Sequence, residues 1–159
     1  EVGYVEGTRR PILELGTLHD DLLRRDFTVN TIAESVDGEI IDPFGGVADL
    51  KLGILRTPLP AEQTMMDDPL RILRALRFQI TKGFSIHEDI WMAMAQPEIL
   101  EKLKTTVSAE RIRDEVFKMM KQDTPMTIKV LSLVDNHSIP GFIDLVFGRG
   151  LWLKPTFEL

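Results

Sequence analysis

The 159-residue sequence predicts an α+β protein, in which short strands and a helix are followed almost entirely by helices. Two short runs of extended character, residues 11–15 and 38–42, lie in the first part of the chain. Pro58 and Pro60 then interrupt the chain, because proline fixes φ and lacks a backbone N–H. After them, apolar residues recur at helical spacing almost to the end. We therefore expect a boundary between two parts close to these prolines.

In the first part, residues 20–32 have helical periodicity and predict a helix between the two strands. Residues 42–46, Asp-Pro-Phe-Gly-Gly, predict a tight turn, because proline fixes φ and glycine accepts positive φ. Residues 48–55 predict a short amphipathic segment that ends near Arg56.

In the second part, a long helix is expected from about Asp68 to Thr81, with Pro69 at its first position and Asp68 as its cap. Gly83 is expected to end this helix. Ser85 or His87 is expected to cap the next one, and Ser108 begins a near capping box. The helices that follow the long one are expected at residues 87–95, 108–120, 126–134 and 139–147.

Composition limits the classes of function. Apolar residues make up 43% of the chain and charged residues 28%, as in ordinary globular proteins. No stretch approaches the apolar length of a membrane span and no signal-peptide pattern is present, so we expect a cytoplasmic protein without a membrane partner. Without cysteine there is no disulfide or thiolate metal site. The net charge of −6 favours recognition of nucleotides in a local arginine-rich pocket over nonspecific coating of nucleic acid.

The long predicted helix carries three arginines and no lysine on the face away from its leucines. Arg71, Arg74 and Arg77 follow one another at intervals of three residues. Arginine presents a planar fork of donors that matches phosphate oxygens and base edges. The spacing therefore predicts a helix that holds a nucleotide.

Asp68 and Arg71 together offer an acceptor and a donor one helical turn apart. A carboxylate accepts from the exocyclic amino group of cytosine or adenine, and a guanidinium donates to a ring nitrogen or carbonyl. Uracil O4 and guanine O6 would face the carboxylate with another acceptor. The pair can therefore select C and A against U and G. The alternative interpretation is a routine helix cap with an i,i+3 ion pair.

A second motif occupies residues 24–30, Arg-Arg-Asp-Phe-Thr-Val-Asn. Asp26 and Asn30 are four residues apart and would share a helical face, where they can bracket a ribose hydroxyl. Arg25 can reach the phosphates of the same ligand. The alternative interpretation is a cluster of ion pairs on a helix surface.

Five motifs in register identify a family. They are residues 24–30, residues 41–50 with the Ile-Asp-Pro-Phe-Gly-Gly run, Leu-Arg-Thr-Pro at 55–58, Asp-Asp-Pro-Leu-Arg-Ile-Leu-Arg-Ala-Leu-Arg-Phe at 67–78, and Ser-Ala-Glu-Arg-Ile at 108–112. Together they resemble the class II tRNA nucleotidyltransferases (CCA-adding enzymes) and the related bacterial poly(A) polymerases. The resemblance covers residues 3–121.

The resemblance implies domains and roles. Residues 1–58 would be the C-terminal part of a nucleotidyltransferase head, residues 59–123 a helical neck that recognises the base, and residues 124–159 the start of a helical body or a tail. Arg25 would be the family's nucleotide-binding arginine, and Asp26 and Asn30 would belong to its ribose-recognising motif. Asp68 and Arg71 would be the amino-acid template that pairs with the incoming base. Arg74 and Arg77 would be further arginines that contact the triphosphate or neighbouring template residues. Glu110 and Arg111 would belong to a helix-capping motif that stiffens the neck.

The resemblance also implies a reaction with Mg²⁺, CTP, ATP and the tRNA 3′ end. In the family an Asp-x-Asp pair holds the Mg²⁺ ions, and this sequence contains no Asp-x-Asp. We therefore expect catalytic metal ligands upstream of residue 1, and a chain that is a fragment inactive alone. The leading hypothesis is addition of CMP and AMP to tRNA. Four alternatives stay open: a poly(A) polymerase, a CC- or A-adding enzyme, a non-catalytic nucleotide- or RNA-binding module, and a purely structural helical domain. The oligomeric state also stays open.

Overall fold

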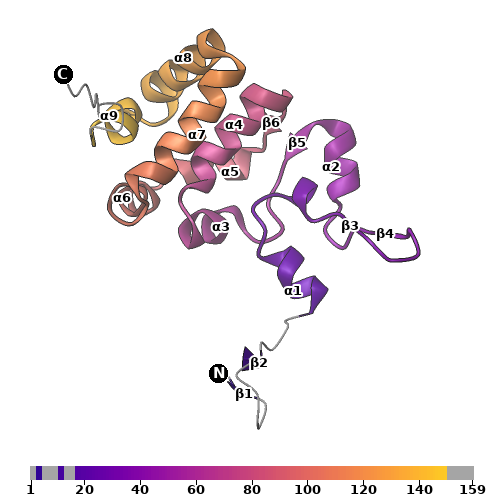
Figure 1. Cartoon of the computed structure of the whole chain (residues 1–159). Helices are drawn as coiled ribbons and strands as arrows, with labels where there is room; N and C mark the ends of the chain where they lie inside the picture. The colour runs from indigo at the N-terminus through magenta and orange to yellow at the C-terminus, as the bar shows by residue number, and fades with distance from the viewer. Residues whose placement is uncertain (1–2, 5–10, 13–16, 150–159) are drawn as a thin grey trace, which may run out of the picture.

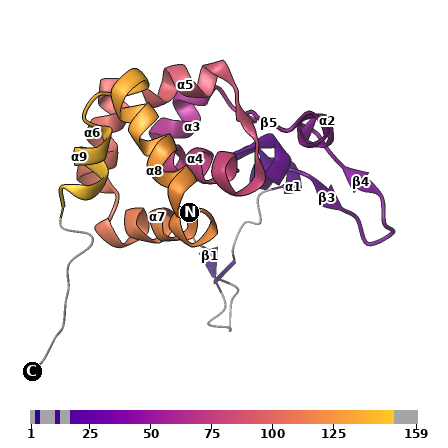
Figure 2. The same cartoon turned by 90° about the horizontal axis from the view of Figure 1, so that it is seen from above.

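The computed structural model describes residues 3–4, 11–12 and 17–149 of the chain. In Figure 1 the purple and indigo elements from the first third of the chain lie to one side of a bundle of later helices. The view in Figure 2 shows the same arrangement, with the β3–β4 hairpin, Ala33–Glu34 and Ile40–Ile41, projecting away from that bundle. Helices with a few short strands confirm the predicted α+β class.

The described residues of the first part form three short helices and five short strands. Within it, β1 pairs with β2 and β3 pairs with β4, both antiparallel. Residues 13–15 of the predicted first strand lie outside the described residues. The remaining elements of this part are β1 Gly3–Tyr4, β2 Pro11–Ile12, α1 Leu18–Leu23, the 3₁₀ helix η1 Thr28–Asn30, α2 Gly46–Leu52 and β5 Ile54–Leu55.

The prediction of one helix over residues 20–32 is wrong. Helix α1 begins earlier, where Thr17 and Asp20 form a capping box, and it ends at Arg24. The chain then turns, because the backbone N–H of Thr28 donates to the carbonyl oxygen of Arg56 at 2.8 Å instead of to a helical partner. Hydrogen bonds from the Thr17 hydroxyl and backbone N–H lower the pKa of Asp20 below its ordinary value.

The predicted turn at residues 42–46 is confirmed, and it begins helix α2. The two carboxylate oxygens of Asp42 accept from the backbone N–H groups of Gly46 at 2.7 Å and Val47 at 3.0 Å. Gly45 has a φ of +74°, which glycine adopts at no steric cost. The carboxylate therefore satisfies N–H groups that the first turn of a helix leaves without partners.

Replacement of Gly46 with alanine is expected to lower the free energy of unfolding by about 3 kcal/mol, since overpacking against a rigid neighbour costs this order. A Cβ atom there would lie 2.1 Å from the backbone oxygen of Thr28, so α2 would have to move off η1. Urea titration measures the change. The control is Gly53→Ala, where φ is positive but nothing lies within 4 Å; its expected cost is only about 1 kcal/mol. Equal losses in both variants would contradict the close approach.

As far as residue 149, where the described residues end, the ordered elements of the second part are helices and one strand. Strand β6 (Ser85–Ile86) pairs in parallel with β5, which joins the two parts through backbone hydrogen bonds. The sequence did not predict α6, which begins with a proline at its first turn. The helices of this part are α3 Ala61–Asp67, α4 Arg71–Lys82, α5 Glu88–Met94, α6 Pro97–Thr106, α7 Ala109–Gln122, α8 Thr124–Leu133, the π-helix η2 Val134–Ser138 and α9 Phe142–Phe147.

The long arginine-bearing helix begins three residues later than predicted. Asp68 has extended backbone angles, φ −143° and ψ 97°, and it ends α3 instead of belonging to α4. Pro69 and Leu70 follow as a turn, and α4 begins at Arg71. The physical reason is the proline, which disfavours helical angles at the residue before it. The predicted end at Gly83 and the predicted caps His87 and Ser108 are confirmed.

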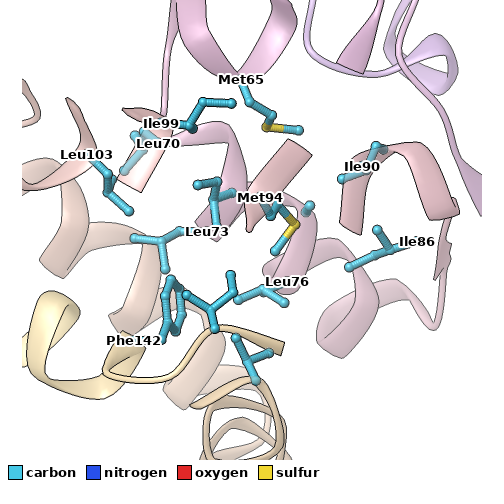
Figure 3. Packing of buried hydrophobic residues seen from close by; sticks show 14 of the residues in the cluster. Met65, Leu70, Leu73, Leu76, Ile86, Ile90, Met94, Ile99, Leu103 and Phe142 are labelled. Atoms are coloured by element: carbon cyan, nitrogen blue, oxygen red, sulfur yellow. The ribbon is translucent and has the colours of Figure 1, made fainter. Parts of the chain in front are cut away.

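The core of the second part surrounds the apolar face of α4 (Figure 3). Leu73 and Leu76 have no exposed surface and are enclosed by side chains from α3, α5, α6 and α9. Burial of this kind contributes about 1.5–3 kcal/mol for each large side chain, so the position of α4 is firmly determined.

Within the part of the chain that the structure describes, no helix is both long and apolar enough to cross a bilayer. The domain boundaries at residues 58 and 123 stay predictions, and residues 150–159 lie outside the described part.

Candidate nucleotide-binding site

A cavity of about 710 Å³ lies where the α1–η1 segment meets helices α4 and α7. This volume falls within the range of about 300–1,000 Å³ that is usual for small-molecule sites. Its lining carries four arginines and two aspartates, so it is locally positive in a chain of net charge −6. Its lining residues are Arg25, Asp26, Val29, Asn30, Ile32, Asp68, Leu70, Arg71, Arg74, Phe78 and Arg111.

Six of the seven predicted site residues line this cavity, although they come from two segments far apart in the sequence, residues 25–30 and 68–74. Asp26 is only 7% exposed, and both of its carboxylate oxygens accept hydrogen bonds. One oxygen accepts from the backbone N–H of Phe27 and from Nδ2 of Asn30 at 2.8 Å. The other accepts from Nε of Arg74 at 2.6 Å. Asp26 therefore orients Asn30 and Arg74 from beneath the cavity.

Asp26 and Asn30 meet, as predicted, but not as neighbours on a helical face. Asp26 lies in the turn after α1, and Asn30 lies at the end of η1. Arg25 lies at the rim, half exposed, where Nη1 donates to the carbonyl oxygen of Asn30 at 2.9 Å and Nη2 pairs with Asp21 at 3.0 Å. Its remaining donors are available to a ligand in the cavity.

Arg71 is fixed in place by two backbone carbonyl groups. Its Nη1 donates to the oxygen of Thr64 in α3 at 2.9 Å, and its Nη2 donates to the oxygen of Arg24 at 2.8 Å. These bonds use two of the five N–H donors of a guanidinium group and tie α4 to the first part of the chain. No Asp68–Arg71 ion pair is present among the described residues, so the ion-pair part of the alternative interpretation is wrong.

The partner of Asp68 is Arg111, a residue that sequence reasoning assigned only to a capping motif. Nη2 of Arg111 lies 2.8 Å from one carboxylate oxygen of Asp68, and Nη1 lies 3.4 Å from the other. The two residues are 43 positions apart. The confirmed cap at Ser108, which begins α7, was the one sequence signal that placed Arg111 in the first turn of a helix.

Arg77 is the one predicted residue outside the lining. Its Nε donates to the buried carboxylate of Glu115 in α7 at 2.5 Å, and its guanidinium lies over the ring of Phe78. Glu115 is 4% exposed, and Nη1 of Arg74 also approaches it, at 3.8 Å. The ionic chain Asp26–Arg74–Glu115–Arg77 therefore joins the first part of the chain to α4 and α7. Sequence reasoning did not single out Glu115, which reads as an ordinary helical residue.

The described residues do not fit a magnesium site. Among them, no three His, Cys, Asp or Glu side chains lie close enough to share a metal ion. The two carboxylates of the cavity, Asp26 and Asp68, are occupied by guanidinium groups. What these residues can do is bind and select a ligand.

Comparison with known proteins agrees with this arrangement. Residues 3–56 match the family model of the Poly A polymerase head domain. The mitochondrial CCA tRNA nucleotidyltransferase of Candida glabrata is 40% identical over 147 residues, which is 91% of this chain and 27% of that protein. The chain thus spans about a quarter of the length of this curated relative.

Two solved structures are similar in fold and sequence. The Bacillus stearothermophilus CCA-adding enzyme in complex with CTP has a TM-score of 0.67 and 37% identity, covering 79% of this chain and 32% of that one. The Thermotoga maritima CCA-adding enzyme complexed with tRNA has a TM-score of 0.66 and 32% identity, covering 84% and 32%. The chain belongs to the class II CCA-adding enzyme and poly(A) polymerase family.

Proposed function

We propose that this chain is the nucleotide-selecting part of a tRNA nucleotidyltransferase that adds CMP and AMP to tRNA 3′ ends. The observation that carries the proposal is the cavity itself, which gathers Asp68, Arg71 and three further arginines between two parts of the fold. Relatives whose names describe CCA addition, and similar structures with CTP or tRNA, support it.

Selection of the base rests on Asp68 and Arg71. The carboxylate accepts from the amino group of cytosine or adenine, and the unused donors of Arg71 reach a ring nitrogen or carbonyl. Uracil and guanine would place a carbonyl oxygen against the carboxylate and leave both acceptors without a donor. Since two backbone carbonyls hold Arg71, its fork is preorganised and little side-chain entropy is lost on binding.

The other lining residues suit the rest of the nucleotide. Arg25 at the rim supplies positive charge to the phosphates, and Arg74 adds charge from the floor. Asn30 offers its remaining amide N–H to a ribose hydroxyl while the other donates to Asp26. Apolar Val29, Ile32 and Phe78 supply the surface against which a planar base can pack.

The test is an incorporation assay with the protein that carries this chain, Mg²⁺ and a tRNA that ends at its discriminator base. Each nucleotide is supplied in turn and then in pairs. Addition of CMP, CMP and then AMP supports the proposal. Repeated addition of AMP alone would assign a poly(A) polymerase, and CMP or AMP alone a partial CCA activity. Nucleotide binding without incorporation would assign a non-catalytic module, and no binding at all would leave a structural domain.

Arg25→Ala is expected to weaken binding of CTP, ATP, UTP and GTP alike, by about tenfold, because a charge-assisted bond to phosphate carries no base information. Isothermal titration with each nucleotide measures the four affinities. Arg113→Ala is the matched control, since Arg113 is a partly exposed arginine of α7 outside the cavity. A loss confined to one base would show that Arg25 reads the base and not the phosphates.

Mg²⁺ and the compartment stay proposals. Divalent magnesium would supply charge neutralisation at the phosphates, with ligands other than the described residues. Cytoplasmic location stays a prediction, and the Candida glabrata relative carries a mitochondrial name.

A further inference from the structure

Arg111 contacts both oxygens of Asp68, the carboxylate that we propose reads the base. Arg111 faces both oxygens of Asp68 with its two terminal nitrogens, at 2.8 and 3.4 Å. The backbone N–H of Leu70 donates to one of these oxygens at 3.2 Å. These three donors leave part of the acceptor capacity of an ionised carboxylate unused, because its two oxygens offer about four sites.

The position of Arg111 is itself well determined. Its backbone N–H donates to the hydroxyl of Ser108, which caps the first turn of α7. The next residue, Ile112, and Val116 one turn later are fully buried in the core around α4. The base of the Arg111 side chain is therefore anchored, while the side chain is 52% exposed and reaches over the cavity.

Asp68, in contrast, has one local hydrogen bond, from the backbone N–H of Leu70 to one carboxylate oxygen. It stands in extended backbone between α3 and α4, and its side chain is 31% exposed. A bond to one oxygen does not by itself fix the plane of the carboxylate, and a turn about the Cβ–Cγ bond would move the second oxygen away from a base. The planar fork of Arg111 removes this freedom, since a two-point contact fixes the plane of the carboxylate.

We propose that Arg111 is a positioning residue that determines base specificity by holding the Asp68 carboxylate in one plane. This inference rests on the proposed function, in which Asp68 reads the base. Arg111 acts through Asp68 and has no contact with the reacting phosphates. Its loss therefore affects which nucleotide is added more than how fast the preferred nucleotide reacts.

The experiment measures kcat and KM for all four nucleotides in the wild-type protein and in Arg111→Ala, Arg111→Lys, Asp68→Ala and the double variant Arg111→Ala/Asp68→Ala. We expect Arg111→Ala to reduce the preference for CTP and ATP over UTP and GTP by about tenfold. Lysine restores the charge but not the fork, so Arg111→Lys should regain only part of the preference. In the Asp68→Ala background, removal of Arg111 should change the preference no further.

Arg113→Ala is again the matched control on α7, and thermal melting shows whether each variant is folded. If Arg111→Ala raised KM for all four nucleotides equally, Arg111 would bind phosphate and the inference would fall. An unchanged preference in a folded, active Arg111→Ala protein would also overturn it while leaving the proposed function intact. A wild-type protein without preference for CTP and ATP would instead overturn the proposed function, and the inference with it.

Discussion

Arg74→Ala is expected to lower the free energy of unfolding by about 3 kcal/mol, the low end of what removing one partner of a buried ion pair costs. The physical reason is Asp26, which is 7% exposed and receives the Nε of Arg74 at 2.6 Å. Without the guanidinium, this charge stays buried with only an amide and one backbone N–H as donors. The expected loss of stability stays at this low end for two reasons. Glu115 still pairs with Arg77, and the Arg74 side chain is already about a third exposed.

Urea unfolding followed by circular dichroism measures this loss. Arg113→Ala, which removes a partly exposed arginine whose ion pair with Asp114 is long, at 3.8 Å, should change the free energy of unfolding by less than about 0.5 kcal/mol. The double variant Arg74→Ala/Asp26→Asn should recover part of the stability, since the buried charge is gone. If Arg74→Ala were as stable as Arg113→Ala, the Asp26–Arg74 contact would not hold the two parts together.

Asp68→Ala is expected to reduce the preference for CTP and ATP over UTP and GTP by about ten- to a hundredfold. Two effects combine, because the amino group of the preferred bases loses its acceptor and the carbonyl of the rejected bases loses its opposing charge. Turnover of the preferred nucleotides should fall less, since the arginines proposed to bind the phosphates are untouched. Single-nucleotide incorporation kinetics for all four nucleotides measure both quantities.

The matched control is Asp67→Ala. Asp67 is the preceding residue, carries the same charge and is exposed, but it does not line the cavity. It should leave the preference unchanged. Equal effects of the two substitutions would mean that the general negative charge at the end of α3, and not the Asp68 carboxylate, selects the base.

Much of the fold was predictable because its signals are local. Helical spacing, the caps at His87 and Ser108, and the turn at residues 42–46 each depend on a few neighbouring residues, and the structure confirms them. The helix predicted over residues 20–32 failed because Thr28 bonds to Arg56, which is far along the sequence. Propensity within a window does not contain such a partner.

The sequence alone determined the ingredients of the site: an arginine-rich helix, a carboxylate before a proline, and a second cluster near residue 25. Only the tertiary structure determined which of these side chains form ion pairs with one another. Asp68 is paired with Arg111 rather than Arg71, and Arg77 is bound by Glu115 outside the cavity. The physical reason is that caps and helical spacing depend on residues close together in the sequence. Ion pairs between helices depend instead on how the apolar face of α4 packs against α7 and brings distant charges together.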